Sequence, residues 1–110
     1  MLTRDQILET RRTLPLETVE AFGGTVTVRT LTGAERERLL NDYQAHRAAG
    51  TVRAAMVVAC VCGGDGKPVF TEQDIAALNG LSGAEIERVF DVACRLNGFG
   101  VKEEDGLRKN

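Results

Sequence analysis

Hydrophobic and polar residues recur with two different periods along the chain, and each change of period marks a boundary between predicted elements. The first residues have helical spacing, and Thr3 with Gln6 has the form of a capping box, so a short helix is predicted from Thr3 to about Thr10. Between residues 16 and 31 the period is two, with β-branched residues on both sides of Gly23–Gly24. This pattern predicts a β-hairpin in which the glycine pair forms the turn.

The second strand of this hairpin is expected to have one buried face and one exposed face. Side chains of a strand alternate between the two faces of a sheet, so Val26 and Val28 are predicted to pack on the core. Thr25, Thr27 and Arg29 are then predicted to face solvent.

The chain from residue 32 to residue 98 has helical periodicity, with segments predicted at residues 33–49, 52–62, 72–78 and 83–97. Three of these segments begin with a hydroxyl residue followed three positions later by an acidic one: Thr32 and Glu35, Thr71 and Asp74, Ser82 and Glu85. In such a pair the hydroxyl accepts from a backbone N–H and the acidic side chain reaches back to another. Both bonds satisfy donors that a helix start leaves unpaired.

The apolar pattern of each helix predicts its place in the fold. In the segment 33–49, Leu39, Leu40 and Tyr43 have core spacing, and the charged run 35–38 is expected outside. The segment 52–62 is apolar nearly all round, which predicts a helix buried centrally, with a strand as the alternative.

The last predicted helix, over residues 83–97, has a single apolar stripe for the core. Its sequence continues into Asn97–Gly98, a pair typical of a left-handed helix end. The stripe consists of Ile86, Val89, Phe90, Ala93 and Leu96.

Together these elements predict one α+β domain over residues 1–100, in which an N-terminal β-hairpin packs with about four to five helices. A chain of 110 residues is long enough to bury one hydrophobic core. Residues 101–110 are rich in charge and contain glycine, and we expect them to form a flexible tail.

The charge balance gives no reason to expect a polyanionic partner. The chain has 14 basic and 16 acidic residues, so no net positive field attracts it to nucleic acid or to an acidic membrane. Arg4, Arg11 and Arg12 are interspersed with acidic residues and are expected on a solvated helix face. The polar N-terminus lacks the apolar region of a signal peptide, so we expect a cytoplasmic protein without a membrane partner.

Residues capable of catalysis or of metal chemistry do not form a recognisable set. Cys60, Cys62 and Cys94 are an odd number, which favours small buried side chains in a reducing compartment over disulfides. The single histidine, His46, lies in a polar stretch with nothing that marks it as a base or a ligand. We therefore expect no enzyme activity, no cofactor and no metal site.

One segment resembles a calcium-binding loop in part. If Val61 is taken as the first position of an EF-hand, Asp65, Gly66 and Glu72 occupy the fifth, sixth and twelfth positions. The first and third positions, Val61 and Gly63, then offer no side-chain oxygen. A plain turn at Asp65–Gly66 is the favoured interpretation, and a calcium-binding helix-loop-helix is the disfavoured alternative.

The order and the amino-acid sequences of four segments resemble those of the tail assembly chaperones of long-tailed bacteriophages and their prophage relatives. The segments are MLTRDQIL at residues 1–8, VRTLTGAER at 28–36, DGKPVFTEQDIAAL at 65–78 and IERVFDVACRLNG at 86–98. None of them is a catalytic motif.

The resemblance implies a protein without enzyme activity that binds the tape measure protein, prevents its hydrophobic helices from aggregating and helps to recruit the tail tube protein. It also implies action in the host cytoplasm and absence from the finished particle. In many members of this family a programmed frameshift adds a second domain to some copies. A structural head-tail connector or other virion protein is the alternative function.

A protein that holds hydrophobic helices needs apolar surface that its own fold leaves accessible. Five apolar residues are candidates for incomplete burial in a single copy, although core packing is the favoured expectation for each of them, and self-association would be a second consequence of their exposure. They are Phe22, Val57, Val61, Leu81 and Phe99.

Overall fold

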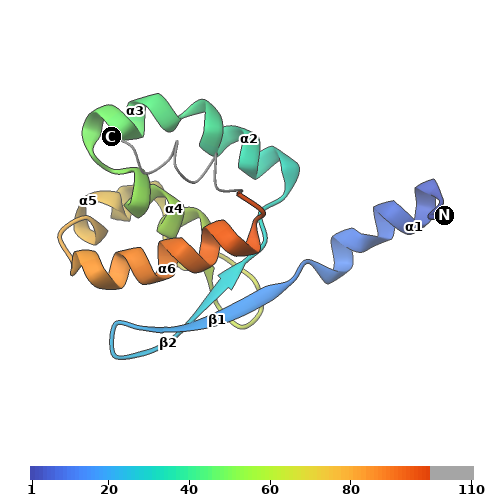
Figure 1. Ribbon diagram of the computed structural model, residues 1–110, viewed down its shortest axis with the longest axis horizontal. Coiled ribbons are helices and arrows are strands. Elements are labelled where there is room, and N and C mark those ends of the chain that lie inside the picture. Colours follow the sequence, from blue (N-terminus) through green and yellow to red (C-terminus); the bar gives the residue numbers. More distant parts are fainter. Residues whose placement is uncertain (100–110) are drawn as a thin grey trace.

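A three-stranded antiparallel sheet and a group of helices make up the computed structural model, which describes residues 1–99 (Figure 1). The strands follow the order β1 (Leu16–Ala21), β2 (Gly24–Arg29) and β3 (Val61–Cys62). β2 pairs with β1 along its whole length, whereas β3 pairs with β2 only at Thr27 and Val28, and Cys62 of β3 also forms a bridge with Pro68. The α+β prediction is confirmed, and the predicted tail at 101–110 lies outside the described residues.

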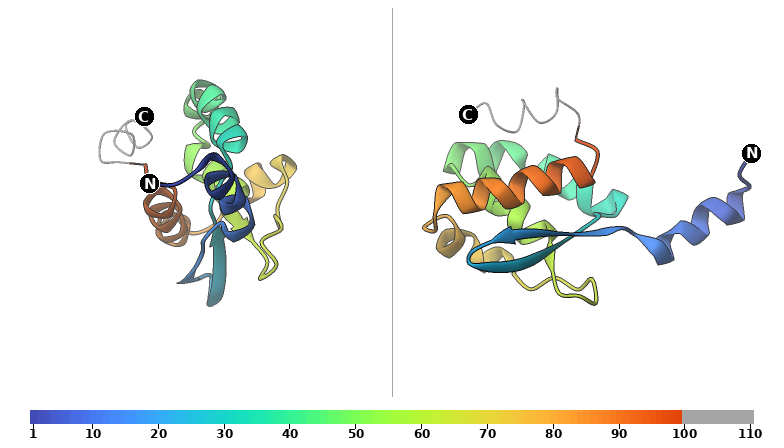
Figure 2. Two further views of the ribbon diagram at one scale, coloured as in Figure 1. Left: turned by 90° about the vertical axis from the view of Figure 1, so that its right-hand side faces the viewer. Right: turned by 60° about the horizontal axis from the view of Figure 1, so that its bottom comes forward.

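Helix α4 is at the centre of the fold and the other long helices surround it (Figure 2). α6 lies against α4 and across the hairpin, and α2 and α3 lie on the opposite side of α4. The helices of the domain are α2 (Gly33–Asn41), α3 (Tyr43–Ala49), α4 (Val52–Cys60), α5 (Ile75–Leu78) and α6 (Gly83–Leu96), with a 3-10 turn η2 (Glu72–Asp74) before α5. An additional helix α1 (Arg4–Glu9) and 3-10 turn η1 (Thr10–Thr13) precede the hairpin.

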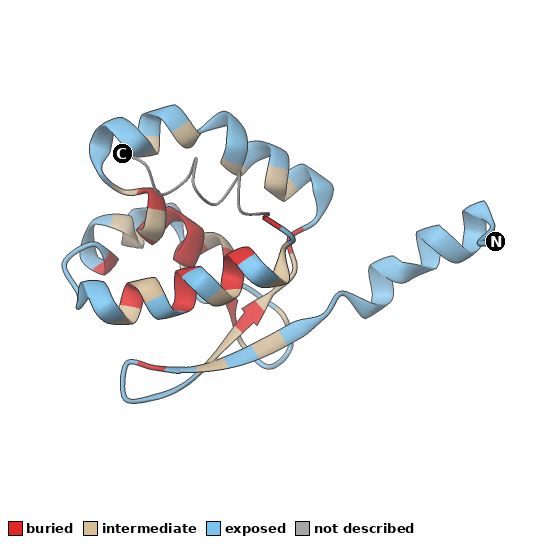
Figure 3. Ribbon diagram, in the orientation of Figure 1, coloured by how far each residue is buried: buried red, intermediate tan, exposed pale blue. Residues whose placement is uncertain are grey.

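The core forms where α4 and α6 pack on the inner face of the sheet. Figure 3 shows most of α4 as buried, as its apolar sequence predicts. The stripe of α6 is confirmed as well, because Val89 and Phe90 are fully buried and Leu96 packs at the margin. Ion pairs at the surface connect α6 to its neighbours: Arg53 of α4 with Glu87, and Arg95 of α6 with Glu17 of β1.

The central helix ends earlier than the sequence predicts. The helix predicted at 52–62 stops at Cys60, and Val61 takes an extended conformation with φ −73° and ψ 131°. Val61 and Cys62 then pair with β2, so the strand alternative holds for these two residues. A β-branched residue followed by glycines favours this switch, because β2 has a free edge that offers backbone hydrogen bonds.

The long helix predicted at 33–49 is two helices, α2 and α3, that meet at Asp42. Backbone hydrogen bonds continue through the junction, from Asp42 to Arg38 and from His46 to Asp42, so the chain bends rather than stops. An Asn-Asp pair at this point has low helix propensity because both side chains compete for backbone groups. The bend leaves Leu40 40% exposed, although its spacing predicted a core position.

The predicted exterior of α2 is also partly wrong. Glu35 and Arg36 are half-buried, because α2 folds against the end of β2 and against the residues that follow α6. The guanidinium of Arg36 lies 4.1 Å from the centroid of the Phe99 ring and donates a hydrogen bond to the carbonyl of Asn97.

The hairpin forms as predicted but turns one residue earlier. The two residues with positive φ are Phe22 at 57° and Gly23 at 80°, and Gly24 already pairs with Ala21 in the ladder. Both positions of a type I′ turn need positive φ, so Phe22 occupies a place that Asn or Gly normally takes.

The faces of β2 are assigned correctly except near β3. Val28 is fully buried and Val26 half-buried, and Thr25 is exposed as predicted. Thr27 is half-buried because it pairs with β3. Arg29 was predicted in solvent, yet only 14% of its side chain is exposed, because α2 folds back over the end of the strand.

The predicted helix ends are largely confirmed. Thr3 and Thr32 form complete capping boxes, and the Asp74 carboxylate accepts from the Thr71 N–H at 2.9 Å. At the last start the Ser82 hydroxyl accepts from the Glu85 N–H, while the Glu85 carboxylate pairs with Arg88. After α6 the φ of Gly98 is 68°, and Phe99 donates back to the carbonyl of Cys94, which is the expected left-handed helix end.

Asn97, the residue after α6, connects that helix to the segment between β2 and α2. Its Oδ1 accepts from the Leu31 N–H at 2.7 Å, and its Nδ2 donates to the carbonyls of Ala93 at 2.9 Å and Arg29 at 3.3 Å. The bonds to the Leu31 N–H and the Arg29 carbonyl satisfy two backbone groups at the end of β2 and just before α2.

We predict that Asn97→Ala lowers the free energy of unfolding by about 2–3 kcal/mol, because the Leu31 N–H and the Arg29 carbonyl lose their partner in a half-buried place. Urea unfolding followed by circular dichroism measures the change. Asn41→Ala, at an exposed position, is the control and should change stability by less than about 0.5 kcal/mol. Equal effects of the two variants would contradict the role of Asn97.

Candidate partner-binding surfaces

The cysteines and the single histidine of the described chain lie in different environments, and none of the three thiols is exposed. All three cysteines are buried and free, as predicted. Burial raises the pKa of the Cys60 thiol to about 12 and also raises the pKa of Cys62. A thiol that stays protonated at neutral pH is a poor nucleophile and a poor metal ligand. His46 Nδ1 lies 3.2 Å from the Thr51 hydroxyl, at the end of α3.

The loop with partial EF-hand spacing is a turn, as the favoured interpretation has it. Asp65 Oδ1 accepts from the Lys67 N–H at 3.0 Å, and Gly66 has a φ of 82°. Glu72 is the first residue of η2. Within residues 1–99 there is no group of three or more His, Cys, Asp or Glu side chains placed to hold a metal ion.

Two of the five apolar residues named as candidates for incomplete burial are exposed. Phe22 is 42% exposed and Leu81 49%. Val57, Val61 and Phe99 are buried, in agreement with core packing as the favoured expectation for each residue. Val57 lies on the central helix, Val61 pairs in the sheet, and Phe99 is covered by Arg36.

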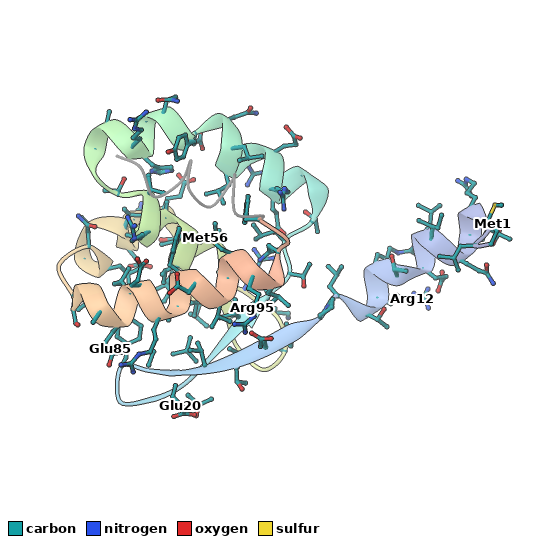
Figure 4. All side chains as sticks on the ribbon, viewed as in Figure 1. Met1, Arg12, Glu20, Met56, Glu85 and Arg95 are labelled. Carbon is teal, nitrogen blue, oxygen red and sulfur yellow. The ribbon has the colours of Figure 1, made fainter. Side chains whose placement is uncertain are left out.

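The largest group of exposed apolar side chains lies on the N-terminal arm, which we define as residues 1–14. The arm projects from the body of the protein, and Figure 4 shows Met1 and Arg12 along it, far from the core residue Met56. Neither α1 nor η1 contains a buried residue. The exposed apolar residues of the arm are Met1, Leu2, Ile7, Leu8 and Leu14.

A short helix of this kind gains little stability by itself. An isolated helix of fewer than about 12 residues is marginal in water. The arm has a capping box, a few exposed side-chain hydrogen bonds to its own carbonyls and two exposed ion pairs, Arg4 with Asp5 and Arg12 with Glu9, all of which are local and exposed. The sequence predicted the helix but not its projection from the domain. The arm is therefore a candidate surface for contact with another chain.

A second candidate surface is a groove of about 250 Å³ between α2, α3, α4 and the segment around η2. We call it the charged groove because an ion pair, Arg29 with Glu35, lies among its walls. Its other side chains include Leu39, Val58, Phe70 and Ile75. Arg38, Asp42 and Glu72 also line the groove, which therefore combines apolar side chains with charges of both signs.

The geometry of this pair sets its electrostatics. The two terminal nitrogens of Arg29 donate to the two oxygens of Glu35, each at 2.9 Å, and the Arg29 Nε donates to the Ala59 carbonyl at 3.1 Å. Burial by itself raises the pKa of Glu35, but the bonds from Arg29 and from Thr32 outweigh it. The pKa of Glu35 therefore lies below its ordinary value of 4.5.

A third surface lies beside the hairpin turn and has a volume of about 410 Å³. We call it the hairpin notch. It is formed by the tip and inner part of β2, by the end of β3 and by the loop that follows. Every residue that lines it is uncharged: Phe22, Thr25, Val26, Thr27, Val61, Cys62, Gly63, Gly64, Val69 and Phe70.

The fold is similar to that of the tail assembly chaperone of bacteriophage HK97. The superposition has a TM-score of 0.57 with 20% sequence identity, and it covers 83% of this chain and 97% of the chaperone chain. No protein-family model matches the sequence, and no curated protein matches it. At this level of identity the likeness to the HK97 chaperone establishes a shared fold.

None of the helices within residues 1–99 is both long enough and apolar enough to cross a membrane.

The sequence indicated Phe22 as a surface residue but did not predict the hairpin notch, because the notch joins residues about forty positions apart. It also missed the charged groove, because Arg29 was expected in solvent.

We predict that the stability contributed by Glu35 depends on pH. Its pKa is lower in the folded chain than in the unfolded chain, so its stabilisation is present at neutral pH and is lost as the pH falls below 4.5 through the folded-state pKa. Glu35→Gln should lower the free energy of unfolding by about 1 kcal/mol at pH 7, and the difference from wild type should shrink in acid. Thermal unfolding between pH 7 and pH 3 tests this. Glu37→Gln, on the exposed side of the same helix, is the control and should change the free energy of unfolding at pH 7 by less than about 0.5 kcal/mol.

We also predict that Phe22→Asn stabilises the protein. A bulky residue with left-handed backbone costs about 1–2 kcal/mol, and Asn adopts this conformation more easily, so the free energy of unfolding should rise by about 1 kcal/mol. The matched control is Phe22→Ala, which also removes the ring but keeps a residue that disfavours positive φ. If the Ala variant gains as much as the Asn variant, removal of the exposed ring and not relief of the backbone explains the gain.

Proposed function

We propose that this chain is a tail assembly chaperone of a long-tailed bacteriophage or prophage. In this role it binds the tape measure protein and supports assembly of the tail tube without catalysing a reaction. The observation that carries the proposal is the fold shared with the HK97 tail assembly chaperone over 83% of this chain. The four sequence segments that resemble this family support it independently.

The surfaces of the protein support a holding function. A chaperone for hydrophobic helices needs accessible apolar side chains and no reactive group. The arm supplies such side chains, and burial keeps the thiols of Cys60 and Cys62 protonated. The near balance of 14 basic and 16 acidic residues suits a protein partner better than a polyanion.

The arm is the part of this surface best placed to meet a helix of the tape measure protein. Ile7 and Leu8 are exposed on α1, and Leu14 is exposed just after η1, so the arm presents apolar side chains along its length. Contact with a partner would bury these side chains and stabilise a helix that is marginal alone. Contact with a second copy of the chain would bury the same side chains, so the proposal includes self-association. It also includes contact with the tail tube protein and action in the host cytoplasm.

Co-expression with the tape measure protein tests the proposal. We expect the tape measure protein to become soluble and to co-purify with this chain. The double variant Ile7→Asp/Leu8→Asp should weaken co-purification at least tenfold. It should leave the melting temperature unchanged, because the arm buries no residue.

The matched control is Thr10→Asp/Thr13→Asp, which adds the same two charges to the arm without replacing an apolar residue. It should retain the complex. A tape measure protein that stays insoluble with this chain, and with any frameshift-extended form of it, would refute the proposal. Detection of the chain in purified particles would then favour a virion component.

A further inference from the structure

The hairpin extends beyond the third strand of the sheet and leaves part of β2 without a neighbour. β3 pairs with Thr27 and Val28, and the chain then turns away at Gly63, whose N–H donates to the Lys67 carbonyl. Within residues 1–99 no strand pairs with residues 24–26 on that side. This free edge of β2 borders the hairpin notch, since Thr25 and Val26 line both.

The ladder shows which backbone groups point into the notch. Thr30 donates to the carbonyl of Pro15, so even-numbered residues of this segment bond toward β1. In an antiparallel strand the bonding direction alternates, and Thr27 accordingly pairs with Cys62 on the other side. The N–H and C=O of Thr25 therefore point away from β1, toward the place that a longer β3 would occupy.

The walls of the notch are suited to an extended apolar chain. Phe22 and Val69 are large exposed apolar side chains on its rim, and none of its lining residues is charged. A Cβ placed on Gly64 would meet no atom within 4 Å, so another backbone has room to approach there. None of the lining residues would offer an opposite charge to a charged segment that lost its hydration here, whereas an uncharged segment needs none.

The conformation of Phe22 is the second observation that points to a ligand. A turn at Gly23–Gly24 would shift the register by two residues, which keeps Val26 and Val28 on the core face and removes the strain. The observed register instead holds Phe22 at a φ of 57° and places it beside the notch. Strained residues that the surrounding structure maintains are concentrated at functional sites.

We propose that the hairpin notch binds an extended, uncharged apolar segment of the partner chain, which adds to the edge of β2 at Thr25 and packs a side chain against Phe22, Val26 and Val69. This inference rests on the proposed function, in which the partner is the tape measure protein. Main-chain hydrogen bonds at a sheet edge provide affinity and the adjacent apolar pocket provides selectivity, as in other cases of strand addition.

The test uses the full chain in complex with the tape measure protein and removes the N–H of Thr25. Thr25→Pro deletes that donor, and the pairing with β1 does not use it. Thr25→Val is the matched control, because it also loses the bond from the Thr25 hydroxyl to Glu20 but keeps the N–H. We expect Thr25→Pro to bind about five- to tenfold more weakly than Thr25→Val in a calorimetric or interferometric titration.

Phe22→Asn separates loss of binding from loss of folding. It should raise the melting temperature by about 4 °C and yet weaken binding at least fivefold. Hydrogen exchange of the wild-type complex should show protection of the Thr25 amide, because strand addition places that amide in a hydrogen bond.

Each failure has a distinct signature. If Thr25→Pro and Phe22→Asn bind the tape measure protein as tightly as Thr25→Val and wild type, or if the Thr25 amide stays unprotected in the complex, strand addition at the notch is refuted and the chaperone function stands. If the wild-type chain itself does not bind the tape measure protein, the proposed function fails and this inference fails with it.

Discussion

The connection between β2 and α2 holds the fold together, because side chains from three elements converge on it. Arg29 at the end of β2 bonds to the last turn of α4 through the Ala59 carbonyl and to the first turn of α2 through Glu35. Asn97 brings the end of α6 to the same connection. The sheet, the central helix and the covering helices are thus fixed to one another at this connection. Parts of the chain that lie away from it, such as the hairpin turn and the arm, can depart from ideal local structure.

The hairpin turn and the N-terminal arm both depart from ideal local structure, but in different ways. The turn is strained but held in place, since the pairing of β1 with β2 and the bond from Thr30 to Pro15 fix its register. The arm is unstrained but supported by no tertiary packing. Both features present apolar side chains to solvent, and neither contributes to the core. The strained turn and the exposed apolar side chains destabilise the isolated protein, and contact with another chain would offset this destabilisation.

Features set by neighbouring residues were predictable from the sequence, and features set by distant ones were not. The helix starts at Thr3 and Thr32 and the end at Gly98 follow from local hydrogen bonds, and the stripe of α6 follows from its period. The choice of Phe22 over Gly24 for the turn was not predictable, because both registers keep the same face of β2 on the core. The burial of Arg29 likewise depends on how α2 folds back, and the hairpin notch exists only once residues 61–70 meet residues 22–27.

The positions of the arm and the notch bear on how a long partner would be held. The arm precedes the first residue of β1 and the turn follows its last, so the two surfaces lie at opposite ends of a strand of six residues, which spans about 20 Å (Figure 1). A partner that contacts both would bind the second surface as an intramolecular event, and its affinity would exceed that of either contact alone. Two modest surfaces at the two ends of β1 would therefore suit the proposed function of holding a long chain, because loss of one contact weakens the other.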